Sequence, residues 1–157
     1  MLSGWSDVTI VAEQILASKE HETNGVIVAD NYYLAVQLAF WSKRKSGIYN
    51  LDDEGINQTG RAAQRAIWEL DEAGLRRNHA GKNALVVIDT RSIAGGNREV
   101  FFERLCGIFE QLHPVLTYGM FGNAWEYKFF IGEGIKSTLA VGRVEHRVTK
   151  SSSRVSC

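Results

Sequence analysis

Two short, unbroken runs of mostly branched aliphatic residues constrain the fold of this chain more than any other sequence feature. The runs are Val26–Ala29 and Ala84–Ile88. Runs of this length and composition are typical of strands buried on both faces, as in parallel sheets that are covered by helices. Ile48–Leu51 is a third candidate strand between them. We therefore expect these three segments to lie side by side in one sheet.

The segments around these strands have the spacing of amphipathic helices. Helices are predicted at Ser6–Ser18, Tyr32–Trp41, Thr59–Ala73 (closed by Gly74) and Phe101–Leu112 (ended by Pro114). Val115–Tyr118 and Trp125–Ile131 are expected to form a final antiparallel strand pair. Because helix and strand alternate, the sequence predicts an α/β fold, a three-layer αβα sandwich with a mostly parallel sheet and an antiparallel edge pair.

Length and charge indicate a single domain with no attraction to nucleic acid. The 157 residues suffice to bury one core, so we expect one α/β domain over residues 1–142 and a flexible polar tail over residues 143–157. Eighteen basic residues balance eighteen acidic ones, and no nucleic-acid partner is predicted. The sequence has no apolar run of about 18 residues, the length that a membrane-spanning helix needs.

The sequence lacks the short motifs of common catalytic and cofactor sites. It has no Walker loop, no dinucleotide glycine fingerprint and no nucleophile elbow. The four histidines have no cysteine, histidine or carboxylate at metal-ligand spacing. The acidic turn Asp52–Glu54 lacks further oxygen ligands at calcium-loop spacing and is interpreted as solvated. We therefore predict no cofactor, no metal and no catalytic residue in this chain.

Polar residues stand at the ends of all three predicted parallel strands. Asp30 follows the first strand, Asn50 lies in the second, and Asp89 and Arg91 follow the third. The carboxyl ends of parallel strands meet at one edge of a sheet, where open α/β sheets bind ligands. These four residues, with Arg98 at the start of a predicted helix, are candidate ligand-binding residues. The alternative is that Asp30 caps a helix and that Asp89 forms a turn.

A short basic cluster follows the aromatic pair Phe40–Trp41. Its members, Lys43, Arg44 and Lys45, are candidate interface residues that face lipid headgroups. The alternative is a solvated helix end, in which these cations complement the helix dipole.

A series of short segments in a fixed order points to a family. The segments are Gly4–Trp5, Val28–Ala35, Leu38–Trp41, Tyr49–Leu51, Gln64, Trp68 and Gly81–Val87. In this order they resemble the soluble C-terminal region of bacterial membrane glycosyltransferases of the dolichyl-phosphate-mannose protein mannosyltransferase type, which include the aminoarabinose lipid A transferases. The resemblance covers roughly residues 4–90. Trp41 stands where the family usually has tyrosine, and Arg65 stands where a tyrosine would follow Gln64.

The resemblance implies a function that this chain does not perform alone. Such enzymes transfer a sugar from a polyprenyl-phosphate carrier to an acceptor on the outer side of the cytoplasmic membrane, and their catalytic carboxylate lies in the membrane portion. It therefore implies a periplasmic accessory domain that caps the membrane active site or guides the acceptor. Its partners would be the membrane portion of the same polypeptide and the lipid-linked sugar or acceptor.

Two other classes of function are compatible with the residues themselves. One is a free-standing α/β enzyme or small-ligand binder that uses the polar residues at the strand ends. The other is an interaction module that uses the final strand pair as an exposed edge.

Overall fold

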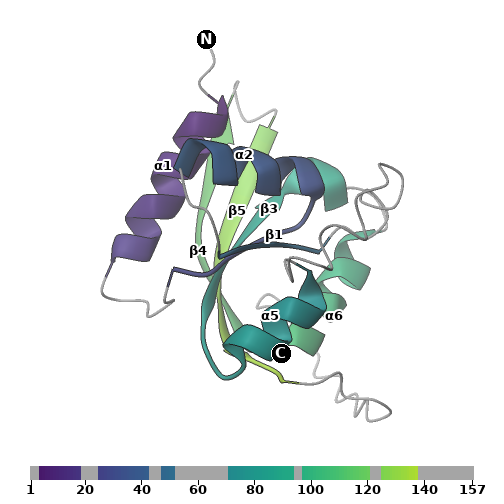
Figure 1. The fold of residues 1–157 in the computed structure, drawn as a ribbon. Helices are drawn as coiled ribbons and strands as arrows, with labels where there is room; N and C mark the ends of the chain where they lie inside the picture. The colour runs from purple at the N-terminus through teal and green to yellow at the C-terminus, as the bar shows by residue number, and fades with distance from the viewer. Residues whose placement is uncertain are drawn as a thin grey trace.

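The chain forms an α/β fold around one five-stranded sheet (Figure 1). The computed structural model describes residues 4–18, 25–42, 47–51, 71–93, 97–120 and 125–137. Its elements are α1 (Gly4–Ala17), β1 (Ile27–Ala29), α2 (Tyr32–Ser42), β2 (Ile48–Asn50), α5 (Glu72–His79), β3 (Ala84–Asp89), the 3₁₀ turn η1 (Thr90–Ile93), α6 (Asn97–Ile108), β4 (Phe109–Met120) and β5 (Trp125–Ile135). The predicted α/β class is confirmed.

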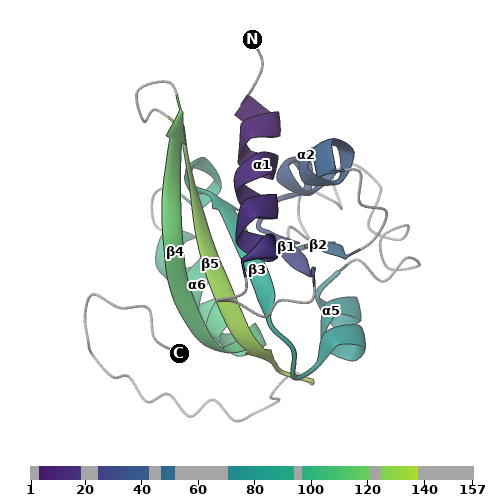
Figure 2. The same cartoon turned by 90° about the vertical axis from the view of Figure 1, so that its left-hand side faces the viewer.

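The sheet is mixed, with the strand order β2-β1-β3-β5-β4. β1 pairs in parallel with both β2 and β3, as the three predicted strands require. β5 pairs antiparallel with β3 and with β4, so the expected antiparallel pair is present. Figure 2 shows β4 and β5 as long strands that run beside β3. Half of the strand pairings are antiparallel, which makes the sheet less parallel than predicted.

Side chains of the central strands alternate between two buried clusters. Ile27 and Ala29 belong to a cluster with the inner sides of α1 and α2, whereas Val28 belongs to a cluster with α5 and α6. Figure 1 shows α1 and α2 on one side of β1, and α5 and α6 on the other. The chain moves from β1 to β2 through α2 and then reaches β3 through α5, and two crossovers of the same hand place their helices on opposite faces.

The last helix is shorter than the sequence predicts. Periodicity favoured a helix through Leu112 that ends at Pro114, but α6 ends at Ile108 and β4 begins at Phe109. Pro114 lies inside β4, next to an irregularity in the pairing with β5. β4 is the terminal strand of the sheet, and an edge strand tolerates a residue without an N–H donor.

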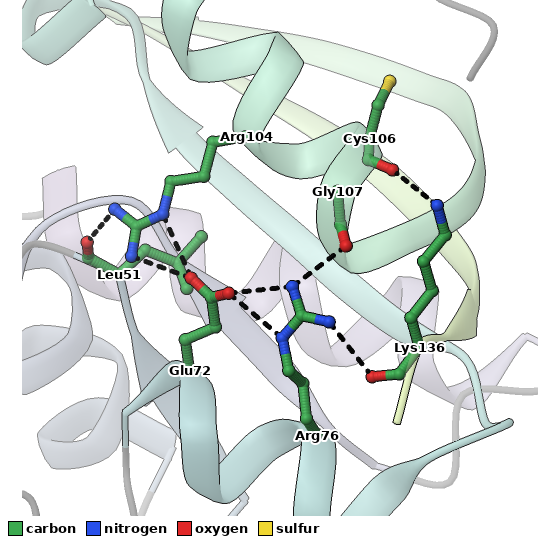
Figure 3. A network of polar contacts seen from close by, with 7 residues as sticks. All are labelled: Leu51, Glu72, Arg76, Arg104, Cys106, Gly107 and Lys136. Carbon is green, nitrogen blue, oxygen red and sulfur yellow. Dashed lines mark hydrogen bonds and ion pairs between the residues drawn. The ribbon is translucent and has the colours of Figure 1, made fainter. Parts of the chain in front are cut away.

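The end of α6 is fixed by donors from other elements (Figure 3). Lys136 Nζ donates to the Cys106 carbonyl over 3.0 Å, and the Lys136 backbone amide donates to the Ile108 carbonyl over 2.8 Å. Arg76 Nη2 donates to the Gly107 carbonyl over 2.9 Å. These carbonyls are the groups that a helix end leaves without intrahelical partners. The helix ends where tertiary donors satisfy them, which local periodicity does not reveal.

The helix before β3 also begins differently from the prediction. Gly74 was expected to end a helix over Thr59–Ala73, but it lies inside the first turn of α5. Residues 59–70 lie outside the described residues. Asp71 caps α5, because its Oδ1 accepts a hydrogen bond from the Gly74 amide over 2.9 Å.

Replacing the capping residue is expected to weaken α5. Asp71→Ala removes the acceptor for the Gly74 amide and should lower the free energy of unfolding by about 1 kcal/mol. Urea denaturation followed by circular dichroism measures the change. Asp71→Ser keeps a side-chain acceptor and should retain most of the stability, so an equal loss in both variants would contradict the capping role.

Candidate functional site

The carboxyl ends of β1 and β3 bring Asp30 and Asp89 into contact. The backbone amide of Asp89 donates a hydrogen bond to Asp30 Oδ1 over 3.2 Å. Both residues are buried, because Asp30 is 7% exposed and Asp89 is 5% exposed. From β1 the chain passes to β2 on one side and then to β3 on the other. The edge between β1 and β3 is therefore the point where the direction of strand order reverses, the usual place of ligand sites in open α/β sheets.

Arg91 holds the Asp89 carboxylate in a two-pronged ion pair. Arg91 Nε donates to Oδ1 over 3.0 Å and Nη2 to Oδ2 over 2.6 Å, and the Arg91 backbone amide adds a third bond over 3.0 Å. The guanidinium carbon lies 3.7 Å from the centroid of the Trp125 ring, a cation–π contact. Hydrogen bonding to Asp89 raises the pKa of Arg91. The positive charge of Arg91 is thus fixed beside the carboxyl end of β3.

Tyr127 completes this cluster from the neighbouring strand. It is paired with Asp89 across β3 and β5, and its side chain is fully buried. Burial, followed by the negative charge of Asp89, raises the pKa of Tyr127 to about 12. The phenol therefore stays protonated at neutral pH beside the carboxylates. We call Asp30, Asp89, Arg91, Trp125 and Tyr127 the sheet-edge cluster.

The raised pKa of Tyr127 predicts a loss of stability in alkali. Because the pKa is 10.0 in the ordinary environment and about 12 in the folded chain, the unfolded state releases the phenolic proton first as pH rises. The neutral phenol stabilises the fold fully below pH 10, and this contribution is lost as pH rises towards about 12. Unfolding of Tyr127→Phe should lack this part of the pH dependence.

Urea denaturation at several pH values between 9 and 12 measures that difference. The exposed Tyr33 supplies the matched control, and Tyr33→Phe should keep the alkaline loss of the parent chain. Identical pH profiles for Tyr127→Phe and the parent chain would contradict the burial of a protonated phenol.

Two asparagines border the cluster. Asn31 caps α2, because its Oδ1 accepts from the Leu34 amide over 2.8 Å, and its Nδ2 donates to Asp30 Oδ1 over 3.2 Å. Asn31 is therefore the N-cap of α2, and Asp30 belongs to the sheet-edge cluster. Asn50 is fully buried and lies in register with Ala29, the residue before Asp30.

Among the predicted ligand-binding residues, Arg98 contacts an aromatic ring outside the sheet-edge cluster. It is exposed on α6, and its guanidinium carbon lies 5.9 Å from the centroid of the Phe102 ring. The predicted interface residues Lys43, Arg44 and Lys45 lie outside the described residues. Sequence reasoning missed Trp125 and Tyr127 as site residues, since only the register of β5 against β3 places them beside Asp89 and Arg91.

A second surface feature lies on α2. Four large apolar side chains of this helix are exposed, namely Tyr33 (67%), Val36 (40%), Phe40 (69%) and Trp41 (43%). Tyr33, Val36 and Phe40, at a spacing of i, i+3 and i+7, lie on the side of the helix away from the buried Leu38, and Trp41 lies at the border of this side, next to α1. We call this surface the outer α2 face.

A groove between α1 and α2 adjoins the outer α2 face. Ile10 and Glu13 line it from α1, and Trp41 lines it from α2. Ile10 is also exposed, so the apolar surface continues from α2 onto α1. Trp41 is held at this boundary by a hydrogen bond from its Nε1 to Gln37 Oε1 over 3.1 Å.

Comparison of the chain with protein-family models, with curated proteins and with solved structures finds no match. The family resemblance therefore stands on the sequence segments given above. Within the ranges that the structure describes, no helix has the length and hydropathy needed to cross a bilayer.

Proposed function

We propose that this chain is the periplasmic accessory domain of a membrane glycosyltransferase that uses a polyprenyl-phosphate-linked sugar. The observation that carries the proposal is where the resembling segments lie. Val28–Ala35 and Leu38–Trp41 form the end of β1 and most of α2, and this helix exposes Tyr33, Phe40 and Trp41. The part of the chain that resembles the family is thus also the part with an uncovered aromatic surface.

An uncovered aromatic helix face supports a role beside a larger body. Most helices at a protein surface are polar on the outside, whereas α2 has no charged residue and is apolar on both sides. Exposed apolar patches mark surfaces that meet another protein or a membrane. An accessory domain at the membrane surface has such a neighbour.

The chemistry of the sheet-edge cluster supports an accessory rather than a catalytic role. The Asp89 carboxylate accepts from the Arg91 side chain at both of its oxygens, and Asp30 Oδ1 accepts from the Asp89 amide and from Asn31. Carboxylate oxygens that already accept hydrogen bonds from the protein are held in place by it and are not directed at a reacting group. We infer that the catalytic carboxylate belongs to the membrane portion and that this domain caps the active site or guides the acceptor.

The proposal includes a finer architecture. We propose that the whole domain is a three-layer αβα sandwich, supported by the two buried clusters that share β1 and β3. One cluster contains inner residues of α1 and α2, and the other contains residues of α5 and α6.

The coding sequence upstream of Met1 tests this proposal directly. We expect the reading frame to continue upstream of this codon and to encode several hydrophobic spans of about 20 residues. A stop codon shortly upstream in the same frame, together with translation that starts at Met1, would contradict the proposal.

A second candidate function rests on the sheet-edge cluster, which lies where strand order reverses. We propose as the alternative that this edge binds a small phosphorylated or hydroxyl-bearing ligand. Arg91, whose side chain is 40% exposed, would supply donors to it. A thermal-shift screen with nucleotides, sugar phosphates and polyprenyl phosphates tests the alternative. A ligand that stabilises the parent chain and Arg98→Gln, but no longer stabilises Arg91→Gln, would support it, and the absence of stabilisation by all of these compounds would contradict it.

A further inference from the structure

We propose that the outer α2 face docks on an anionic lipid surface. The proposal names the neighbour of this face and can be tested on the present chain. It does not depend on the assignment to a glycosyltransferase, because binding to vesicles needs no sugar transfer.

The first argument is the distribution of polarity around α2. Leu34, Ala35 and Leu38 face the core and are buried. On the opposite side, Tyr33 and Phe40 are the two most exposed large apolar residues of α2. A helix that is apolar on both sides is normally covered on both sides. The outer face thus has the composition of a surface that is removed from water in the working state.

The second argument is the kind of residue on this face. Tyr33 and Trp41 combine an apolar ring with a polar group, and such side chains gather at the level of lipid headgroups. The rings of Phe40 and Trp41 meet edge to face, with centroids 5.2 Å apart, and form one broad apolar wedge. A helix that lies in the plane of a membrane inserts a surface of this type into the headgroup boundary.

The third argument is charge, and it favours an anionic rather than a neutral lipid surface. Lys43, Arg44 and Lys45 follow directly after Ser42, the last residue of α2, so three cations border the aromatic wedge in the sequence. Each cation near an anionic bilayer strengthens binding. On the groove side, Glu13 of α1 lies beside Ile10 and Trp41. Glu13 opposes binding on the groove side, whereas the three cations follow the end of α2 that carries Phe40 and Trp41, so we expect this end to lie nearest the headgroups.

Co-sedimentation with lipid vesicles tests the proposal. We expect the chain to bind vesicles of phosphatidylcholine mixed with phosphatidylserine and to bind vesicles of phosphatidylcholine alone much more weakly. Binding to the anionic vesicles should decrease as salt is raised. The double substitution Phe40→Ser with Trp41→Ser should lower the partition coefficient on anionic vesicles by about tenfold.

The matched control is Val100→Ser, which removes an exposed apolar residue from α6 on the other side of the molecule. This variant should bind like the parent chain. Circular dichroism of the double variant should show an unchanged fold, since Phe40 and Trp41 are exposed. If that variant misfolds, Phe40→Ser alone provides the same comparison.

Three outcomes would overturn the proposal. The first is binding of folded Phe40 variants that equals that of the parent chain, and the second is no binding to anionic vesicles at all. The third is a dimer in sedimentation equilibrium that the substitutions at Phe40 and Trp41 abolish while vesicle binding persists, which would make this face an interface between protein chains.

Discussion

Gly132→Ala is expected to destabilise the fold by about 3 kcal/mol or to prevent folding. Gly132 lies in β5, where an added Cβ would come within 2.5 to 2.7 Å of three ring atoms of Phe109. Phe109 begins β4 and is fully buried, so its ring has no free space to move into. The backbone of β5 must therefore shift, at the cost of pairing with β3 and β4. Urea denaturation of the variant measures the loss.

Gly107→Ala is the matched control for this substitution. Gly107 lies in α6, and a Cβ added there meets no atom within 4 Å. Alanine in a helix is favoured over glycine by up to about 1 kcal/mol, so this variant should be at least as stable as the parent chain. Combining Gly132→Ala with Phe109→Leu should recover part of the stability. Parent-like stability of Gly132→Ala alone would contradict the close packing of β5 on Phe109.

Glu72→Ala is expected to lower the free energy of unfolding by about 3 kcal/mol. One carboxylate serves two arginines: Arg76 Nε and Nη2 donate to Oε2 over 3.0 and 2.9 Å, and Arg104 Nη2 donates to Oε1 over 3.0 Å (Figure 3). The Arg76 side chain is only 6% exposed. Removing the carboxylate takes away an anion that two arginines share at a largely buried position, which costs more than the loss of a surface pair. Thermal and urea unfolding measure this cost.

The same network explains why Glu72→Ala should loosen several elements together. Arg104 also donates to the Leu51 carbonyl after β2, and Arg76 donates to carbonyls of Gly107 and Lys136. Glu72 therefore links α5 to α6 and holds both arginines that reach the ends of β2 and β5. Glu103→Ala, on an exposed position of α6, is the control and should change stability by less than about 0.5 kcal/mol. Equal effects of the two substitutions would contradict the role of the network.

The strands and the α/β class were predictable because their signals are local. Val26–Ala29 and Ala84–Ile88 are apolar at every position, and the structure buries these residues and places β1 and β3 at these segments. The inner side of α2 followed from periodicity in the same way, since Leu34 and Leu38 are buried. Local pattern and tertiary packing agree in these elements.

The last helix and the last strand were harder because tertiary contacts decide them. Phe109 and Leu112 fit the spacing of a helix that continues from α6, but the structure places both in β4. Donors from Arg76 and Lys136, which are distant in the sequence, end the helix at Ile108. Pairing with β5 then supplies the backbone partners of β4. No periodicity argument contains that information.

The candidate sites divide in the same way between residues that local sequence signals predict and residues that tertiary contacts add. The meeting of Asp30 and Asp89 followed from the parallel arrangement of β1 and β3, and Arg91 follows Asp89 closely in the chain. Tyr127 and Trp125 joined them only through the antiparallel register of β5. The outer α2 face was not predicted, because a sequence pattern that gives the buried side of a helix does not say whether the other side is covered.

We propose that the outer α2 face is the surface through which this domain meets a membrane. NMR spectra of the isotopically labelled chain, recorded with anionic bicelles that carry a paramagnetic headgroup lipid, locate the membrane-facing surface residue by residue. We expect selective broadening at Tyr33, Val36, Phe40 and Trp41, which are exposed, while resonances of Val100 and Leu116, exposed on α6 and β4, stay sharp. Broadening centred on β4 or on the sheet-edge cluster, or no broadening on α2, would rule out docking through the outer α2 face.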